Sequence, residues 1–95
     1  MKYFIVEGSL HVDKMDKDLL QKHMAYTQKK LDEGLILTSG LKLDMSGGVF
    51  IIKSDSLESL NEYLDNEPLK KAGIQSYKVI EFKPHYINEK AKSWF

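Results

Sequence analysis

The sequence has no cysteine, no excess of either charge and no long apolar run. Without cysteine, a disulfide framework, a thiolate metal site and a cysteine nucleophile are all excluded. Its 14 lysine and arginine residues balance its 14 aspartate and glutamate residues, so no overall field attracts nucleic acid or an anionic membrane. No segment approaches the ~20 apolar residues of a membrane-spanning helix, and the first residues do not have the composition of a signal peptide. We therefore expect a cytoplasmic protein without nucleic-acid or membrane partners.

The residues that are present are typical of a small folded domain. Hydrophobic residues make up 42% of the 95 residues and charged residues 29%, which is too apolar for a disordered chain. A chain of this length has room for a single core. We predict one domain over residues 1–95, with its core at 1–84 and a C-terminal tail at 85–95.

The hydrophobic pattern predicts elements in the order β-α-β-β-α-β. Runs of β-branched and aromatic residues indicate strands, and apolar residues at 3.6-residue spacing indicate helices. This order is that of a ferredoxin-like, split βαβ fold of the α+β class, with an antiparallel sheet. The strands are predicted at residues 2–7, 35–43, 47–54 and 74–83, and the helices at residues 16–33 and 55–64.

Local signals indicate the helix ends and the buried helix face. Gly34 is suited to end the first helix, because glycine readily adopts the left-handed conformation of a C-terminal cap. Asp55, with Glu58 three residues later, resembles a capping box for the second helix. Three apolar residues of the first helix fall near one line, which predicts that they form its buried face. These residues are Leu20, Met24 and Leu31.

Two of the predicted strands are apolar on both faces. In a lone domain of this fold the helices cover one sheet face and water meets the other, so its strands should alternate. A second copy of the chain is the simplest cover, because most soluble oligomers are symmetric homodimers; the alternative is an open face with scattered apolar residues. Trp94 and Phe95 in the tail would also suit a partner subunit or a packed edge. The residues that make both faces apolar are Tyr3, Phe4, Ile5 and Val6 in the first strand and Val49, Phe50, Ile51 and Ile52 in the third.

Four segments, in this order and spacing, resemble the YciI-like family. Each motif is weak by itself, but together they cover most of the chain, as far as about Pro84. The resemblance implies a dimeric α/β-barrel, in which two ferredoxin-like sheets pack face to face, and this agrees with the two-sided strands. The segments are residues 23–26 (HMAY), 34–40 (GLILTSG), 47–52 (GGVFII) and 67–74 (EPLKKAGI).

The same resemblance implies a candidate site. Members of the family carry a histidine on the first helix and an aspartate just before a proline after the second helix, which are proposed to form a catalytic dyad. His23 matches the histidine, and Glu67 before Pro68 matches the aspartate with a side chain one methylene longer. Asp65 is the alternative partner. The proline that usually follows Ser-Gly in the family is replaced here by Leu41.

The residues themselves also make His23 a candidate acid or base. An imidazole exchanges protons near neutral pH, and a carboxylate on one ring nitrogen would fix its tautomer. His23 is predicted beside the buried face of its helix, so a half-buried surface histidine is the alternative interpretation. An enzyme would need His23 within ~3 Å of a carboxylate, or one water away, and facing an open pocket.

Other polar residues are weaker candidates. Ser39 and Gly40 end the apolar run of the second predicted strand and could hold a substrate oxygen, although a Ser-Gly pair more often accommodates a bulge or close packing. Tyr3, Tyr26 and Tyr77 are expected in the core or an interface, with their hydroxyl groups bonded. The histidines lack the spacing of a zinc site and no phosphate- or dinucleotide-binding motif occurs, so we expect no metal and no cofactor.

These observations lead to two functional hypotheses. The first is a homodimeric enzyme acting on a small-molecule substrate, with His23 as general acid/base oriented by Glu67 or Asp65, for isomerisation or a lyase-like step. The second is a non-catalytic metabolite-binding or accessory dimeric module, because function resides in the site and not in the fold.

Overall fold

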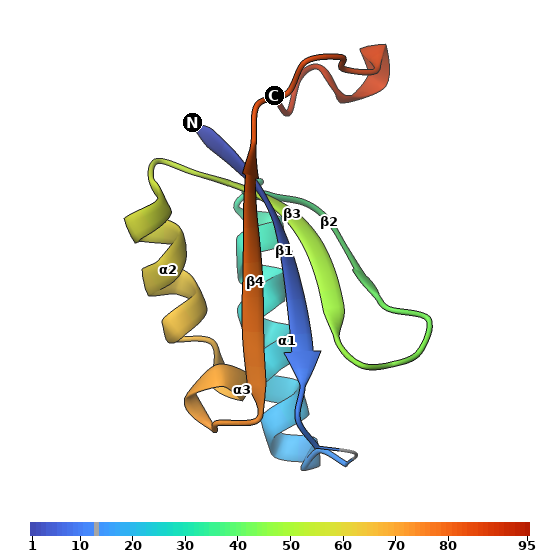
Figure 1. Ribbon diagram of the computed structural model, residues 1–95, viewed down its shortest axis with the longest axis vertical. Helices are drawn as coiled ribbons and strands as arrows, with labels where there is room; N and C mark the ends of the chain where they lie inside the picture. The colour runs from blue at the N-terminus through green and yellow to red at the C-terminus, as the bar shows by residue number, and fades with distance from the viewer. Residues whose placement is uncertain (13) are drawn as a thin grey trace.

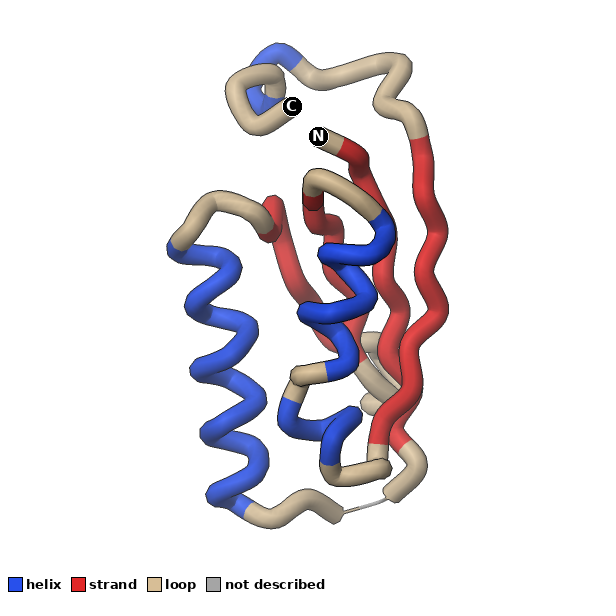
Figure 2. The backbone as a smooth tube through the Cα atoms, turned by 90° about the vertical axis from the view of Figure 1, so that its left-hand side faces the viewer, coloured by secondary structure: helices blue, strands red, loops and turns tan. Residues whose placement is uncertain are grey.

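The computed structural model describes residues 1–12 and 14–95 and shows a four-stranded sheet with its main helices on one face (Figure 1; Figure 2). The strand order is β2-β3-β1-β4, and each neighbouring pair is antiparallel. The prediction of a ferredoxin-like α+β fold is confirmed. The strands are β1 (Lys2–Leu10), β2 (Ile36–Leu41), β3 (Gly48–Ser54) and β4 (Gln75–Phe82), the α-helices are α1 (Lys17–Asp32), α2 (Leu57–Asp65) and α3 (Pro68–Lys71), and a 3-10 turn, η1 (Glu89–Ala91), lies in the tail.

Helix α1 ends at the predicted glycine. Gly34 has a φ of +78°, the left-handed conformation that glycine adopts without strain. Its N–H donates to the carbonyl of Leu31 at 3.0 Å, and the N–H of Leu35 donates to that of Lys30 at 3.1 Å. These two bonds form a Schellman motif, which satisfies the last carbonyl groups of the helix and directs the chain into β2.

The predicted cap of α2 is wrong by one residue. Ser56, and not Asp55, is the N-cap, since its hydroxyl accepts the backbone N–H of Ser59 at 3.1 Å. Ser56 has the extended backbone of a cap residue, and its short side chain reaches the third N–H of the helix.

The prediction for the inner face of α1 is also wrong. Leu20, Met24 and Leu31 are 39%, 54% and 39% exposed. The half-buried positions that follow one side of the helix begin at Leu19 and include His23 and Tyr26. The Tyr26 ring stacks on Tyr63 of α2 with 4.7 Å between ring centroids, and its hydroxyl donates to the Tyr63 carbonyl at 2.7 Å. Contacts with α2 and α3 thus decide which face turns inward, and they place His23 on it.

The hydrophobic core lies between the sheet and the helices. Alternate residues of β1 and β3 point into it, and the leucines of α2 close it. Each fully buried aliphatic side chain there stabilises the fold by about 1.5–3 kcal/mol relative to exposure. The buried core residues are Phe4, Val6, Ile36, Ile52, Leu60 and Leu64.

The other face of the sheet carries the remaining apolar residues of these strands. The register places Ile5 of β1 opposite Ile51 of β3 on one side and Ile80 of β4 on the other. The three side chains therefore form an apolar row across the centre of this face, and Ile80 is 46% exposed. No helix in the described part of the chain is both long and apolar enough to cross a membrane.

The C-terminal tail folds back onto its own chain at the end of the sheet where β1 begins (Figure 2). Trp94 and Phe95 pack against Tyr3, with ring centroids 5.8 and 5.1 Å away. The Trp94 indole N–H donates to the carbonyl of Gly34 at 2.7 Å, and the Lys53 ammonium lies 4.7 Å from the Trp94 ring. Trp94 and Phe95 therefore pack against other residues of the same chain, at this end of the sheet.

Candidate active site

The candidate site is built around Glu67, in the short connection between α2 and α3. Glu67 is the N-cap of α3, and its Oε2 accepts the backbone N–H groups of Leu69 at 3.0 Å and Lys70 at 3.3 Å. Pro68, at the first helical position, has no N–H to satisfy and ends any continuation of α2. Glu67 is 2% exposed, so this cap is a buried carboxylate.

His23 reaches the same carboxylate from the inner face of α1. Its Nδ1 lies 2.6 Å from Glu67 Oε1. An ionised carboxylate only accepts hydrogen bonds, so the ring nitrogen that faces it carries a proton. The lone pair of the neutral imidazole is then on Nε2. The His23 side chain is 29% exposed, which leaves part of the ring accessible above its buried partner.

Two side chains of β4 complete the surroundings of Glu67. The Tyr77 hydroxyl donates to Glu67 Oε2 at 2.9 Å, and the Gln75 amide donates to the Tyr77 oxygen at 2.7 Å. The Gln75 amide also lies 3.4 Å from Glu67 Oε2. Oε2 therefore has four donors and Oε1 has His23, and no buried side-chain N or O atom of the described residues lacks a partner.

Gly8 provides the space for this arrangement. It pairs with Tyr77 across β1 and β4, on the sheet face that is covered by the helices. A Cβ at Gly8 would lie 3.0 Å from Gln75 Oε1 and 3.5 Å from a carbon of the Tyr77 ring. Because no side chain is there, the Tyr77 ring lies edge-on to Phe50 of β3, with 6.4 Å between centroids.

The electrostatics follow from burial and from these bonds. Burial alone would raise the pKa of Glu67. The hydrogen bonds from His23, Tyr77 and the Lys70 backbone N–H, together with the charge of His23, outweigh burial, so the pKa lies below the ordinary glutamate value. Burial and the adjacent Glu67 carboxylate raise the pKa of Tyr77 well above its ordinary value. Glu67 is therefore ionised and Tyr77 protonated at neutral pH, as the hydrogen-bond directions require.

The other predicted site residues do not join this cluster. Asp65 is exposed and forms an ion pair with Lys70 at the surface. Ser39 and Gly40 are exposed on β2, at the opposite edge of the sheet from β4. Three strand spacings separate those edges, or ~14 Å. Glu67 is thus the carboxylate that contacts His23, and the binding role of Ser39 and Gly40 stays a prediction.

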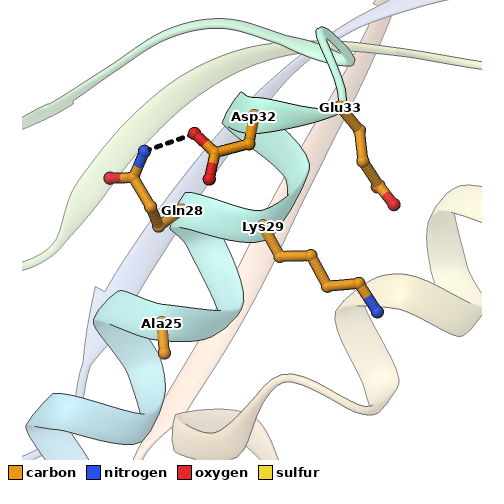
Figure 3. Close-up of a pocket in the computed structure, with 5 residues that line it drawn as sticks. All are labelled: Ala25, Gln28, Lys29, Asp32 and Glu33. Carbon is orange, nitrogen blue, oxygen red and sulfur yellow. Dashed lines mark hydrogen bonds between the residues drawn. The ribbon is translucent and has the colours of Figure 1, made fainter.

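Two surface hollows lie away from the cluster. A hollow of about 460 Å³ is lined by exposed residues of α1 and its C-terminal end, where the Gln28 amide donates to Asp32 at 2.8 Å (Figure 3). A second, of about 350 Å³, lies between α1 and α2 beside the Tyr26–Tyr63 stack. Both are open and lined by mixed charges, and neither includes His23 or Glu67. We place the candidate site at His23 because the buried carboxylate and its donors converge there.

The sequence singles out His23 and Glu67, which the structure brings into contact, but not the contacts from β4. It predicts a bonded hydroxyl for Tyr77 without naming the partner, and it does not single out Gln75. One signal was present: residues 75 and 77 are on the same face of a strand that begins directly after α3. Within the described residues, no three His, Cys, Asp or Glu side chains gather as metal ligands do.

Comparisons with known proteins agree with this architecture. Muconolactone isomerase has a TM-score of 0.76 at 17% identity, over 92% of this chain and 94% of its own. The 5-chloro-2-hydroxyhydroquinone dehydrochlorinase TftG of Burkholderia phenoliruptrix AC1100, solved in complex with 2,5-dihydroxybenzoquinone, has a TM-score of 0.65 at 21% identity, over 85% and 93%. A protein of Arabidopsis thaliana has a TM-score of 0.53 at 13% identity, over 93% and 99%.

At these identities the solved structures share the fold alone. No protein of curated function matches the sequence. The profile of the YCII-related domain family, however, matches residues 1–83, which is most of the chain. As the resemblance of its motifs predicted, this chain belongs to the YCII-related domain family.

Proposed function

We propose that this protein is an enzyme that transfers a proton on a small organic molecule, with His23 as the acid/base and Glu67 as its orienting partner. The observation that carries the proposal is the 2.6 Å contact between His23 Nδ1 and Glu67 Oε1, made by a carboxylate that is 2% exposed. A histidine oriented in this way by a buried acid is a recurring arrangement in acid–base catalysis.

The proposed chemistry begins at His23 Nε2. This nitrogen takes a proton from a carbon beside a carbonyl group, and the electron pair of the broken bond stays on the substrate as an enolate. The imidazolium that forms is stabilised by the Glu67 carboxylate, which keeps its charge. Return of the proton to a different carbon completes an isomerisation, and departure of a leaving group completes an elimination. Both outcomes are consistent with neighbours that are named an isomerase and a dehydrochlorinase.

The assembly that we propose is a homodimer in which two sheets meet through their open faces. The apolar row of Ile5, Ile51 and Ile80 supports it, because no helix of residues 1–12 and 14–95 covers that face. Sedimentation of the wild type should give the mass of a dimer, and Ile80→Lys should give a monomer. Leu20→Lys, at an exposed apolar residue of α1, is the control and should remain dimeric. A monomeric wild type would reject this assembly.

A second candidate function is a non-catalytic metabolite-binding or accessory module. It is favoured by the position of the two hollows beside and between the helices, because neither of them includes His23. Under this hypothesis the His23–Glu67 bond contributes to the fold and supports no turnover.

Exchange of substrate hydrogen with solvent separates the two functions. The protein is incubated in D₂O with a panel of small cyclic and acyclic carbonyl compounds, and deuterium uptake is followed by mass spectrometry. His23→Ala should slow uptake by about 10²–10⁴-fold, the usual contribution of a general base. His85→Ala removes an exposed histidine and should leave the rate unchanged. Equal uptake with the wild type and His23→Ala would reject the role of His23.

A further inference from the structure

The two oxygens of Glu67 have very different surroundings. Oε2 accepts from two backbone N–H groups and from the Tyr77 hydroxyl, and the Gln75 amide lies 3.4 Å away. Among the residues that the structure describes, Oε1 has one partner, His23 Nδ1, at 2.6 Å. Because donors from the α3 backbone and from β4 converge on Oε2, the carboxylate cannot rotate without leaving them unpaired, and Oε1 stays directed at His23.

The two hydrogen-bond donors on β4, Gln75 and Tyr77, both donate toward Glu67. The Gln75 amide donates to the Tyr77 oxygen, so the one hydroxyl proton of Tyr77 is available for Glu67 Oε2. The Gln75–Tyr77 and Tyr77–Glu67 bonds polarise each other and are strengthened by a low local dielectric. They end at the Glu67 carboxylate, to which His23 Nδ1 donates separately through Oε1. Tyr77 therefore acts on His23 by holding the carboxylate in place.

We propose that Tyr77 is a positioning residue: its hydroxyl, supported by Gln75, holds Glu67 so that His23 keeps its proton on Nδ1 and presents Nε2 as the base. The catalytic meaning of this inference rests on the proposed function. The tautomer itself is a property of the protein without substrate, so it can be measured even if no turnover is found.

The proposed role of Tyr77 depends on its hydroxyl group and not on the packing of its ring. The ring lies over Gly8 and edge-on to Phe50, and a phenylalanine ring would fill the same space. Tyr77→Phe therefore removes one hydrogen bond to Glu67 and retains the packing. Tyr26→Phe is a matched control, because it removes a tyrosine hydroxyl bonded to a backbone carbonyl and leaves Glu67 untouched.

The tautomer is read from the ¹⁵N chemical shifts of the histidine ring at the alkaline limit of a titration, with the His23 signals assigned from their loss in His23→Ala. In the wild type and in Tyr26→Phe, Nδ1 should carry the proton almost completely. In Tyr77→Phe the carboxylate is held less firmly, so the ratio of the Nε2–H form to the Nδ1–H form should rise, by up to about tenfold where Glu67 loses the equivalent of one hydrogen bond to Nδ1–H. Gln75→Leu should change the ratio in the same direction.

Two results would overturn the inference. One is a wild-type His23 with its proton on Nε2, and the other is a ratio in Tyr77→Phe that equals that of the wild type. If Tyr77→Phe does not fold, an unchanged ratio in Gln75→Leu has the same consequence. A fixed Nδ1–H tautomer together with no exchange of substrate hydrogen would reject the proposed function while leaving the positioning role in place.

Discussion

Replacing Glu67 by glutamine should destabilise the protein at neutral pH and much less in acid. The substitution keeps the shape of the side chain but removes its charge. Oε2 must still accept from the donors around it, so the new amide nitrogen would replace Oε1 and face His23 Nδ1. The imidazole would then have to become an acceptor, with its proton on Nε2.

The expected magnitude follows from the bonds that change. Hydrogen bonds to a charged group contribute about 1.5–3 kcal/mol each and neutral ones about 0.5–1.5 kcal/mol. Several bonds to Glu67 become neutral at once, but the donors keep an acceptor. We expect a net loss of about 2–3 kcal/mol in the free energy of unfolding at neutral pH. That is a large part of the about 5–15 kcal/mol of a typical domain.

The pH dependence identifies the cause of this loss. The pKa of Glu67 is lower in the folded protein than its ordinary value of 4.5, so protonation favours the unfolded chain. The stabilisation by the carboxylate is therefore complete above that ordinary value and is lost as the pH falls through the folded-state pKa. The difference between wild type and Glu67→Gln should shrink over this acid range, because the glutamine does not titrate.

Urea unfolding followed by far-UV circular dichroism, from neutral pH down to about pH 3, measures this difference. Asp65→Asn is the matched control, since it neutralises an exposed carboxylate two residues away whose ion pair with Lys70 contributes at most about 1 kcal/mol. A loss in Glu67→Gln that is constant across the pH range, or an equal loss in Asp65→Asn, would refute the reasoning.

Three further predictions concern single residues. The pKa of Tyr77 is raised in the fold, so its protonated form stabilises the protein below the ordinary value of 10.0, and this contribution is lost as the pH rises through the folded-state pKa. In urea unfolding, Tyr77→Phe should therefore lose less stability than the wild type at alkaline pH. Gly47→Ala should cost about 1–3 kcal/mol by the same assay, because φ is +155° and a Cβ would lie 2.0 Å from the Gly8 carbonyl oxygen. Ser56→Ala should cost about 1 kcal/mol, whereas Asp55→Ala should change the melting temperature little, which tests which residue caps α2.

The fold was predictable because its elements have strong local signals. The β-branched runs of β1 and β3 and the left-handed position of Gly34 depend only on nearby residues. The inner face of α1 does not. Leu20 and Met24 are more apolar than His23 and Tyr26, yet they face solvent. The orientation of a helix in the fold is decided by contacts with residues far along the chain. The local pattern of apolar residues does not contain this information.

The site was predictable only in part for the same reason. The family resemblance indicated His23 and Glu67, and the distance between them agrees. The roles of Gln75 and Tyr77 depend on the register of β4 against β1, which places Tyr77 beside the one residue of β1 that has no side chain, Gly8. Sequence order shows which residues share a strand face, but not which carboxylate that face meets.

Glu67 stands where the family resemblance implies an aspartate, and its greater length has a structural consequence. The Glu67 carboxylate connects two helices, because Oε2 caps the start of α3 and Oε1 contacts His23 on α1. An aspartate at this position would still cap α3, because a short side chain is well suited to an N-cap. Its second oxygen would lie about one carbon–carbon bond, ~1.5 Å, further from His23, beyond hydrogen-bond distance.

Glu67→Asp should therefore separate the two roles of this residue. We expect its unfolding free energy to fall by less than that of Glu67→Gln, since the charge and the cap remain, while His23 loses its fixed Nδ1–H tautomer. Hydrogen exchange on a substrate should then slow nearly as much as in His23→Ala. If Glu67→Asp instead retains both the tautomer and the exchange rate, α1 and α3 can approach each other to close the gap, and the added methylene is not what connects the cap to the imidazole.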